Sequence, residues 1–173
     1  MNENNLKSIS PIDGRYSKIS NKISSYFSEY ALIKYRVYVE IEYFKALCDI
    51  PLKQLASINS SDKKKISAIA SKFSLENANR IKKIEQKINH DVKAVEYFIK
   101  EEFDDLGLKN YKEFIHFGLT SQDINNTATP LMLKFCLKNI LLPNLGDVLK
   151  LLKNKADDFI NISMIARTHG QAA

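Results

Sequence analysis

Glycine and proline are scarce in this sequence, which contains five and four of them among 173 residues. Because these two residue types most often interrupt helices and strands, their scarcity excludes a loop-rich chain and predicts long elements. Tryptophan is absent, and the only cysteines are Cys48 and Cys136. Both lie in apolar helical patterns without a CxxC motif or cysteine–histidine spacing. This argues against a structural zinc site and indicates two buried thiols.

Long hydrophobic runs are also missing. No apolar stretch is long enough to cross a bilayer, and the opening residues MNENNLKS lack the apolar core of a secretory signal. The sequence therefore predicts a cytoplasmic protein without a membrane partner. The net charge of +6 favours an anionic ligand. Lysines form only one run, Lys63 to Lys65, so a nucleic-acid-binding domain is a weak alternative and no nucleic-acid partner is expected.

What the sequence does contain is helical periodicity. Between Ser17 and Cys48 apolar residues recur every three or four positions, apart from a gap near Lys34, and no glycine or proline occurs. This predicts one long helix interrupted at Pro51. Further helices are expected to begin at residues that can cap a helix or complement its dipole: Ser60 or Ser61, Ser74 and Asp91. No alternating strand of convincing length is present, so the predicted fold is all-α.

The segment DDLGLKN is loop-like, and we place a domain boundary there, between residues 1–110 and 111–173. Beyond it we expect a short helix over YKEFIHFG, a long helix from Ile124 to Leu142, and another helix with Pro143 in its first turn. Pro130 predicts a kink or a late start in the long helix. The last helical segment is apolar around much of its circumference, which predicts a bundle completed by other chains or further residues.

Four polar segments interrupt the helices: SPIDGRYSK, NHD, TSQDINN and RTHGQ. In the first, Arg15 offers a planar fork of donors for phosphate or carboxylate, and Tyr16 adds a hydroxyl and a ring. In the second, His90 lies between Asn89 and Asp91 at a helix start, where the acid could polarise the imidazole. The alternatives are an N-terminal anchoring turn and a helix cap with an exposed histidine.

In the third segment, Thr120 and Ser121 stand at a helix start, where free N–H groups and the helix dipole attract a carboxylate. Ordinary capping is the alternative. In the fourth, His169 can give or take a proton near neutral pH, although a histidine in this position can also be structural. Together the segments offer donors and imidazoles but no metal motif or cysteine nucleophile. They favour binding a multiply anionic small molecule and moving a proton on it.

These four segments, in this order on a helical background, strongly resemble the bacterial adenylosuccinate lyase family of the fumarase/aspartase superfamily. The stretches NHDVKAVEYF and EFIHFGLTSQDINN carry most of the resemblance, and PIDGRY favours this family over its siblings. A sibling such as argininosuccinate lyase or fumarase, which carry variants of RTHGQ, stays an alternative. So does a non-catalytic helical module that binds nucleotide or self-associates.

The resemblance implies elimination of fumarate, from adenylosuccinate to give AMP and from succinyl-aminoimidazole-carboxamide ribotide (SAICAR) to give AICAR. It implies no cofactor or catalytic metal, and a homotetramer whose sites draw on three subunits. His169 matches the family's general acid, and the remaining matches are substrate-binding. These are Arg15 and Tyr16 for the nucleotide part, Asn89, His90 and Asp91 as a triplet, and Thr120 and Ser121 for a succinyl carboxylate.

One part of the family pattern is missing. The family's general base is a serine on a flexible glycine- and serine-rich loop, followed by a Met-Pro-x-Lys-x-Asn motif, and this sequence contains neither. The resemblance therefore implies a truncated chain, with an N-terminal helical domain and the first long helices of a central helical bundle. We expect these 173 residues alone to be inactive as a lyase.

Overall fold

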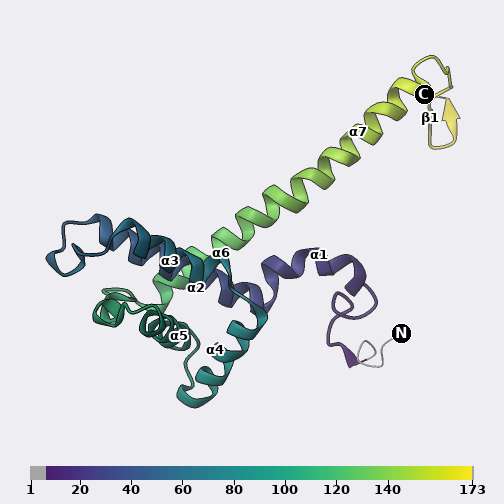
Figure 1. The fold of residues 1–173 in the computed structure, drawn as a ribbon. Coiled ribbons are helices and arrows are strands. Elements are labelled where there is room, and N and C mark those ends of the chain that lie inside the picture. Colours follow the sequence, from purple (N-terminus) through teal and green to yellow (C-terminus); the bar gives the residue numbers. More distant parts are fainter. Residues whose placement is uncertain (1–6, 173) are drawn as a thin grey trace. The chain divides into compact units, whose positions relative to one another are not determined.

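The computed structural model describes residues 7–172, which form helices and one short two-stranded hairpin (Figure 1). The all-α prediction is confirmed. The α-helices are α1 (Ser17–Phe27), α2 (Glu29–Asp49), α3 (Ser60–Ser71), α4 (Leu75–Ile88), α5 (Asp91–Asp105), α6 (Ser121–Cys136) and α7 (Leu142–Phe159). Shorter elements are the 3₁₀ turns η2 (Lys53–Leu55) and η3 (Lys109–Phe114), the π-helical turn η4 (Leu137–Leu141), and the strands β1 (Arg167–Thr168) and β2 (Gln171–Ala172).

The single helix predicted over residues 17–48 is wrong, because the chain breaks at Ser28. This residue is extended (φ −83°, ψ 164°), and its hydroxyl accepts a hydrogen bond from the amide of Ala31 at 3.1 Å. The cap satisfies one of the unpaired amides at the start of α2, so the break costs little. Periodicity missed it because apolar residues keep nearly the same spacing on both sides of a one-residue interruption.

The other predicted helix starts agree more closely with the structure. Ser74 caps α4 and α5 opens at Asp91, as predicted. Helix α3 does begin at Ser60, but the capping side chain belongs to Asn59, whose Oδ1 accepts from the amides of Ser61 and Asp62. The short helix predicted over YKEFIHFG is instead a 3₁₀ helix that ends at Phe114.

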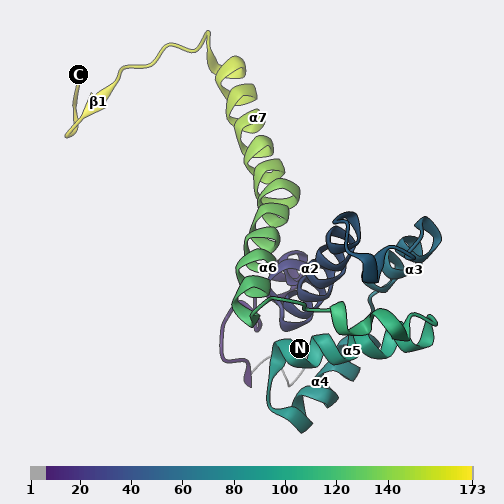
Figure 2. The same cartoon turned by 90° about the vertical axis from the view of Figure 1, so that its left-hand side faces the viewer.

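By contacts the chain divides into two compact units, one ending at Phe135 and the other starting at Cys136. In the first unit α2 packs against α3, α4 and α5, which gather around it (Figure 2). The core contains edge-to-face aromatic pairs, such as Phe44 against Phe103 with centroids 4.9 Å apart. Cys136 is buried as predicted, whereas Cys48 is only half-buried against the core. The domain division predicted near residue 110 stays a prediction.

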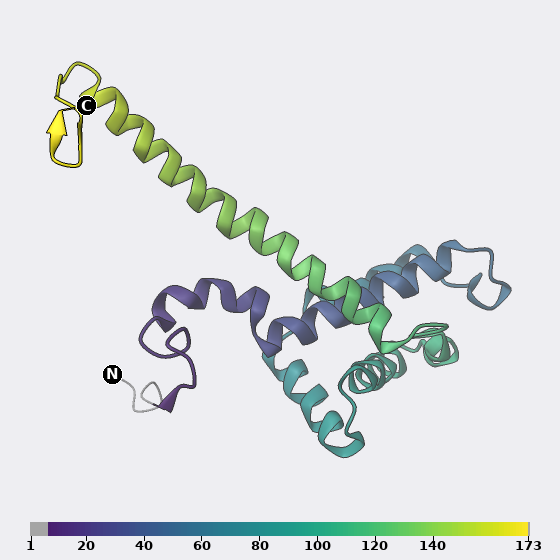
Figure 3. The same ribbon diagram turned by 180° about the vertical axis from the view of Figure 1, so that it is seen from behind.

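Helix α6 starts at Ser121 and includes Pro130, which excludes the late start predicted for this helix. The π-helical turn follows directly, and Pro143 lies in the first turn of α7 as predicted. No residue of α7 is buried among the described residues, and its apolar side chains are exposed as expected. They include Leu145, Val148, Leu149 and Leu152, each 48–67% exposed. Beyond α7 the second unit ends in the β1–β2 hairpin (Figure 3).

Candidate functional site

The Asn89–His90–Asp91 triplet forms the turn between α4 and α5. Asn89 ends α4 in the left-handed conformation (φ 54°, ψ 39°), which asparagine tolerates better than most residues. His90 is the N-cap of α5, and its Nδ1 accepts a hydrogen bond from the amide of Lys93 at 3.1 Å. An accepting Nδ1 assigns the ring proton of the neutral imidazole to Nε2. Because the side chain is 52% exposed, this N–H is available to a ligand.

Both carboxylate oxygens of Asp91 are engaged. Oδ1 accepts from the amide of Val92 at 2.8 Å, and Oδ2 lies 2.7 Å from Nη2 of Arg36. Oδ1 is 3.8 Å from Nδ1 of His90, beyond hydrogen-bond distance. Although burial raises the pKa of Asp91, the hydrogen bond from the Val92 amide and the Arg36 charge outweigh it and hold the pKa below its ordinary 3.8. Asp91 is therefore a fixed anion.

At the start of α6, the donors of Thr120 already have a partner. Its amide and its hydroxyl both donate to Oδ2 of Asp123, each at 2.7 Å. The hydrogen bond from the Thr120 amide, followed by the one from its hydroxyl, lowers the pKa of Asp123. The capping alternative thus describes Thr120 in this structure. Half-buried Ser121 makes no side-chain hydrogen bond with residues 7–172 and keeps its hydroxyl available.

Arg36 joins two of the four polar segments. Its Nη2 contacts Asp91 at the start of α5, and its Nε donates to Oδ1 of Asn125 in α6 at 2.9 Å. The Arg36 side chain is only 8% exposed. Sequence reasoning missed this residue because both partners are distant in the chain. The available signal was a charge on the apolar face of α2, next to Val37 and three residues after Ile33.

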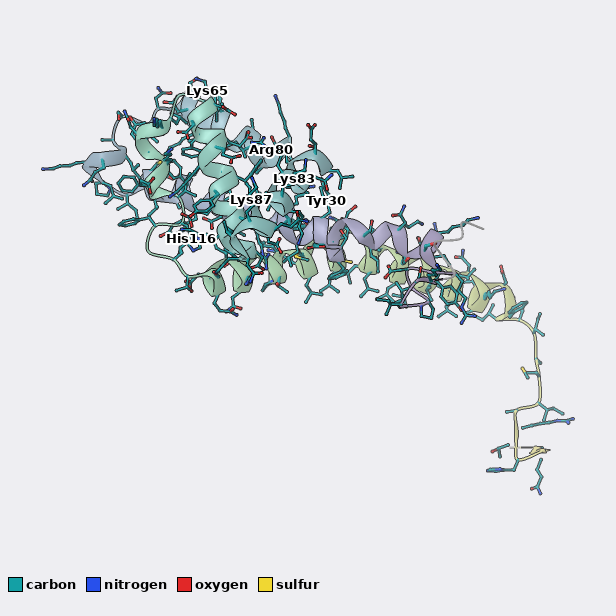
Figure 4. All side chains as sticks on the ribbon, turned by 90° about the horizontal axis from the view of Figure 1, so that it is seen from below. Tyr30, Lys65, Arg80, Lys83, Lys87 and His116 are labelled. Carbon is teal, nitrogen blue, oxygen red and sulfur yellow. The ribbon has the colours of Figure 1, made fainter. Side chains whose placement is uncertain are left out.

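Glu40 and His116 form a second buried contact that sequence reasoning missed. The Glu40 side chain is 0% exposed, and its Oε1 lies 2.5 Å from Nδ1 of His116, while Oε2 has no partner among the described residues. Burial raises the pKa of Glu40 above 4.5, although the hydrogen bond with His116 opposes this. His116 lies on the segment between η3 and α6 (Figure 4) and has a positive φ of 60°.

The remaining predicted site residues are exposed. The Arg15 guanidinium lies 4.9 Å from the ring centroid of Tyr16, just before α1. In the second unit, His169 and Gly170 form the turn of the β1–β2 hairpin with φ values of 50° and 78°. Positive φ at both central residues is typical of a type I′ turn, which glycine makes easy. The structure thus connects the second and third polar segments through Arg36.

Within residues 7–172, no group of three or more histidine, cysteine or acidic side chains is arranged to hold a metal ion. Over the same range, none of the helices combines the length and apolarity needed to span a membrane.

Comparison with known proteins gives consistent matches. A family model described as Lyase matches residues 14–173. The adenylosuccinate lyase of Dictyostelium discoideum is 52% identical over 175 residues, which cover 98% of this chain and 38% of that protein. The Vibrio cholerae serotype O1 enzyme of the same name is 41% identical (97% and 37% covered), and that of Escherichia coli K12 is 40% identical (100% and 38% covered).

The chain therefore spans less than two fifths of the length of these curated relatives. The match to the family model nevertheless extends over nearly the whole chain, including all of the NHD, TSQDINN and RTHGQ segments. On this evidence the chain belongs to the lyase family.

Proposed function

We propose that this chain supplies the substrate-binding N-terminal part of an adenylosuccinate lyase. That enzyme would release fumarate from adenylosuccinate, giving AMP, and from SAICAR, giving AICAR. The observation that carries the proposal is the 52% identity over 98% of the chain to a protein named adenylosuccinate lyase. The contacts of Arg36 support it, because they connect two segments that the family uses for substrate binding.

The proposed reaction breaks a C–N bond by β-elimination. A base removes a proton from the succinyl carbon beside a carboxylate, and negative charge grows on the carboxylate oxygens. The electron pair then forms the double bond of fumarate as the C–N bond breaks. His169 acts as the general acid that protonates the departing nitrogen. The base is a serine on the glycine- and serine-rich loop that this sequence does not contain.

The donors that the structure leaves available support part of these binding roles. His90 offers Nε2–H at an exposed position, which suits orienting an anionic substrate. Arg15 and Tyr16 supply a guanidinium and a hydroxyl for the nucleotide part. Asn89 and Asp91 complete the triplet as binding residues.

Thr120 and Ser121 bind a succinyl carboxylate in this proposal. The position of the Asp123 carboxylate determines which of their donors the substrate can reach. Because Asp123 accepts from both donors of Thr120, a substrate carboxylate meets the free Ser121 hydroxyl first. Engaging Thr120 requires the Asp123 carboxylate to move aside. The Asp123 carboxylate therefore occupies a position that suits a carboxylate of the substrate.

We further propose a homotetramer in the cytoplasm that needs no cofactor or metal and has no nucleic-acid partner. The exposed apolar side chains of α7 support an oligomer, since an uncovered helix face of this length is rare on monomers. A self-associating module without catalysis is the second candidate, and the same exposed face favours it.

The test uses the full-length protein, meaning a polypeptide of the relatives' length that carries these residues. Wild type should release fumarate from adenylosuccinate but not from argininosuccinate. Replacing His169 with alanine should lower kcat roughly 100- to 10,000-fold in a folded protein, the typical cost of losing a positioned proton donor. Fumarate release by His169→Ala at the wild-type rate would refute the role. Release from argininosuccinate alone would favour the sibling lyase, and AMP binding without turnover would favour the non-catalytic module.

A further inference from the structure

Arg36 is the one guanidinium in the described part of the chain that reaches two of the polar segments from inside the fold. We propose that Arg36 is a positioning residue, which holds the turn 89–91 and the first two turns of α6 in the relative placement that substrate binding requires. This inference rests on the proposed function and adds to it a residue outside the resemblance.

The geometry of the contacts supports this role. Nη2 of Arg36 meets Oδ2 of Asp91 at 2.7 Å, and Nε meets Oδ1 of Asn125 at 2.9 Å. Because a guanidinium is planar and rigid, two of its nitrogens fix the separation between the two acceptors. A lysine ammonium is a point charge on a flexible stem and cannot impose that spacing.

Arg36 is buried and its partner Asp91 is half exposed, which is suitable for a positioning residue behind a binding segment. The Arg36 side chain is 8% exposed, whereas that of Asp91 is 49% exposed. Arg36 therefore holds Asp91 from the core side and leaves the outer side of the turn open. In Asn125, Oδ1 accepts from Nε of Arg36, and the Nδ2 donors stay available to another partner.

Helix α2 also contacts the segment that leads into α6. Glu40, one turn after Arg36, contacts His116, which precedes Thr120 by four residues. Asn125 follows Ser121 by four residues and contacts Arg36. The Thr120–Ser121 pair thus lies midway between two side-chain contacts with α2. A shift of either contact would move the donors of Thr120 and Ser121.

Stability alone is a poor explanation for this arginine. Burying a guanidinium carries a desolvation cost, and a well-packed apolar side chain at the same position is often equally stable or better. Solvent also screens the attraction between the two charges, because Asp91 remains half exposed. A role in fixing the geometry of two binding segments accounts for the position of the charge.

The experiment compares two arginine-to-lysine variants of the full-length protein. Arg80 is the matched control, because it contacts Glu101 and Glu102 of α5 at 3.0 and 2.7 Å on a part of the first unit without site residues. Arg36→Lys should raise KM for adenylosuccinate about tenfold to a hundredfold, the range for a hydrogen bond to a charged group. Arg80→Lys should leave kcat and KM within about twofold of wild type, since it affects the ion pairs with Glu101 and Glu102 and the contact with the Phe98 ring, none of which involves a site residue.

A double-mutant cycle with Asn125→Ala provides a second measurement. If Arg36 acts partly through Asn125, the KM increases of Arg36→Lys and Asn125→Ala should not multiply in the double variant. If Arg36→Lys does not fold, Asn125→Ala alone decides, because it keeps the pair with Asp91. A KM increase at unchanged Tm supports the inference, and an unchanged KM overturns it.

Three further outcomes distinguish a failure of this inference from a failure of the proposed function. A wild-type protein that releases fumarate, with Arg36→Lys showing wild-type kcat and KM, overturns only the role of Arg36. Equal losses in Arg36→Lys and Arg80→Lys, each in proportion to a lower Tm, also overturn it by showing a structural effect. A folded wild-type protein without fumarate release overturns the proposed function itself, and the positioning role with it.

Discussion

Arg36 and Asp91 form an ion pair of 2.7 Å between a buried guanidinium on α2 and a half-exposed carboxylate at the start of α5. The pair fixes the charge state of Asp91, since the guanidinium and the Val92 amide both favour the anion. Because Asp91 is held by Arg36, it makes no hydrogen bond with His90, and the amide of Lys93 orients the imidazole instead. The second polar segment therefore owes its geometry to backbone caps and to one arginine from another helix.

The lowered pKa of Asp91 predicts how stability depends on pH. Because the folded-state pKa lies below the unfolded 3.8, the pair stabilises the fold above about pH 4, and this contribution is lost as pH falls through the folded pKa. Asp91→Asn should therefore destabilise the protein at neutral pH, and the difference from wild type should shrink in acid. Thermal unfolding of both proteins across the acidic range measures this. A difference that stays constant down to about pH 2 would contradict the prediction.

Glu40 should show the opposite dependence. Its folded-state pKa is raised above 4.5, mainly by burial, so its ionisation costs stability as pH rises through and above 4.5. Glu40→Gln removes that cost and keeps a hydrogen-bonding group opposite His116. The variant should gain stability relative to wild type as pH rises above about 4.5, and the gain should level off once pH passes the folded-state pKa of Glu40. Denaturant unfolding at several pH values is the measurement.

Glu113 provides the control for that prediction. It is exposed, and its hydrogen bond and ion pair with Lys100 lower its pKa below 4.5. Glu113→Gln should therefore lose a small amount of stability above pH 4.5, where Glu40→Gln gains. If both variants shift stability in the same direction as pH rises, the contrast between the buried and the exposed carboxylate is not the cause.

The sequence predicted the helices well because their signals are local. Apolar spacing identified α3 to α5, and Ser74 and Asp91 marked two starts that the structure confirms. The connections within the site were not local. Arg36 and Asn125 are 89 residues apart, and Glu40 and His116 are 76 apart, so no pattern within one helix predicts either contact. The sequence signals them only through two charges on the buried face of α2, Arg36 and Glu40.

Thr120 shows a second limit on what the sequence alone can predict. Its position at a helix start was predicted correctly, but its donors were expected to face a ligand. Asp123, three residues further on, occupies them instead, as acidic residues in a first helical turn often do. The same residue pattern is compatible with a cap and with a ligand site, and only the hydrogen bonds distinguish the two.

The cap at Ser28 predicts a measurable loss of stability. Ser28→Ala removes the acceptor for the Ala31 amide at the break between α1 and α2, which should cost about 1 kcal/mol of unfolding free energy. Ser61→Ala is the control, because Ser61 is exposed and the cap of α3 is Asn59. That variant should change stability by less than about 0.5 kcal/mol. Equal effects of the two substitutions would show that the Ser28 hydroxyl is not the cap that matters.

The exposed apolar face of α7 predicts self-association. Leu149 is 67% exposed and lies one turn from Leu145 and Leu152, so burying this face against a partner should contribute about 1.5–3 kcal/mol per leucine. Leu149→Glu should therefore weaken assembly about tenfold or more, whereas Lys150→Glu, on the neighbouring exposed position, should change it far less. Sedimentation or light scattering over a dilution series measures the assembly. If Leu149→Glu assembles as strongly as wild type, α7 does not form the interface and the proposed oligomer needs another surface.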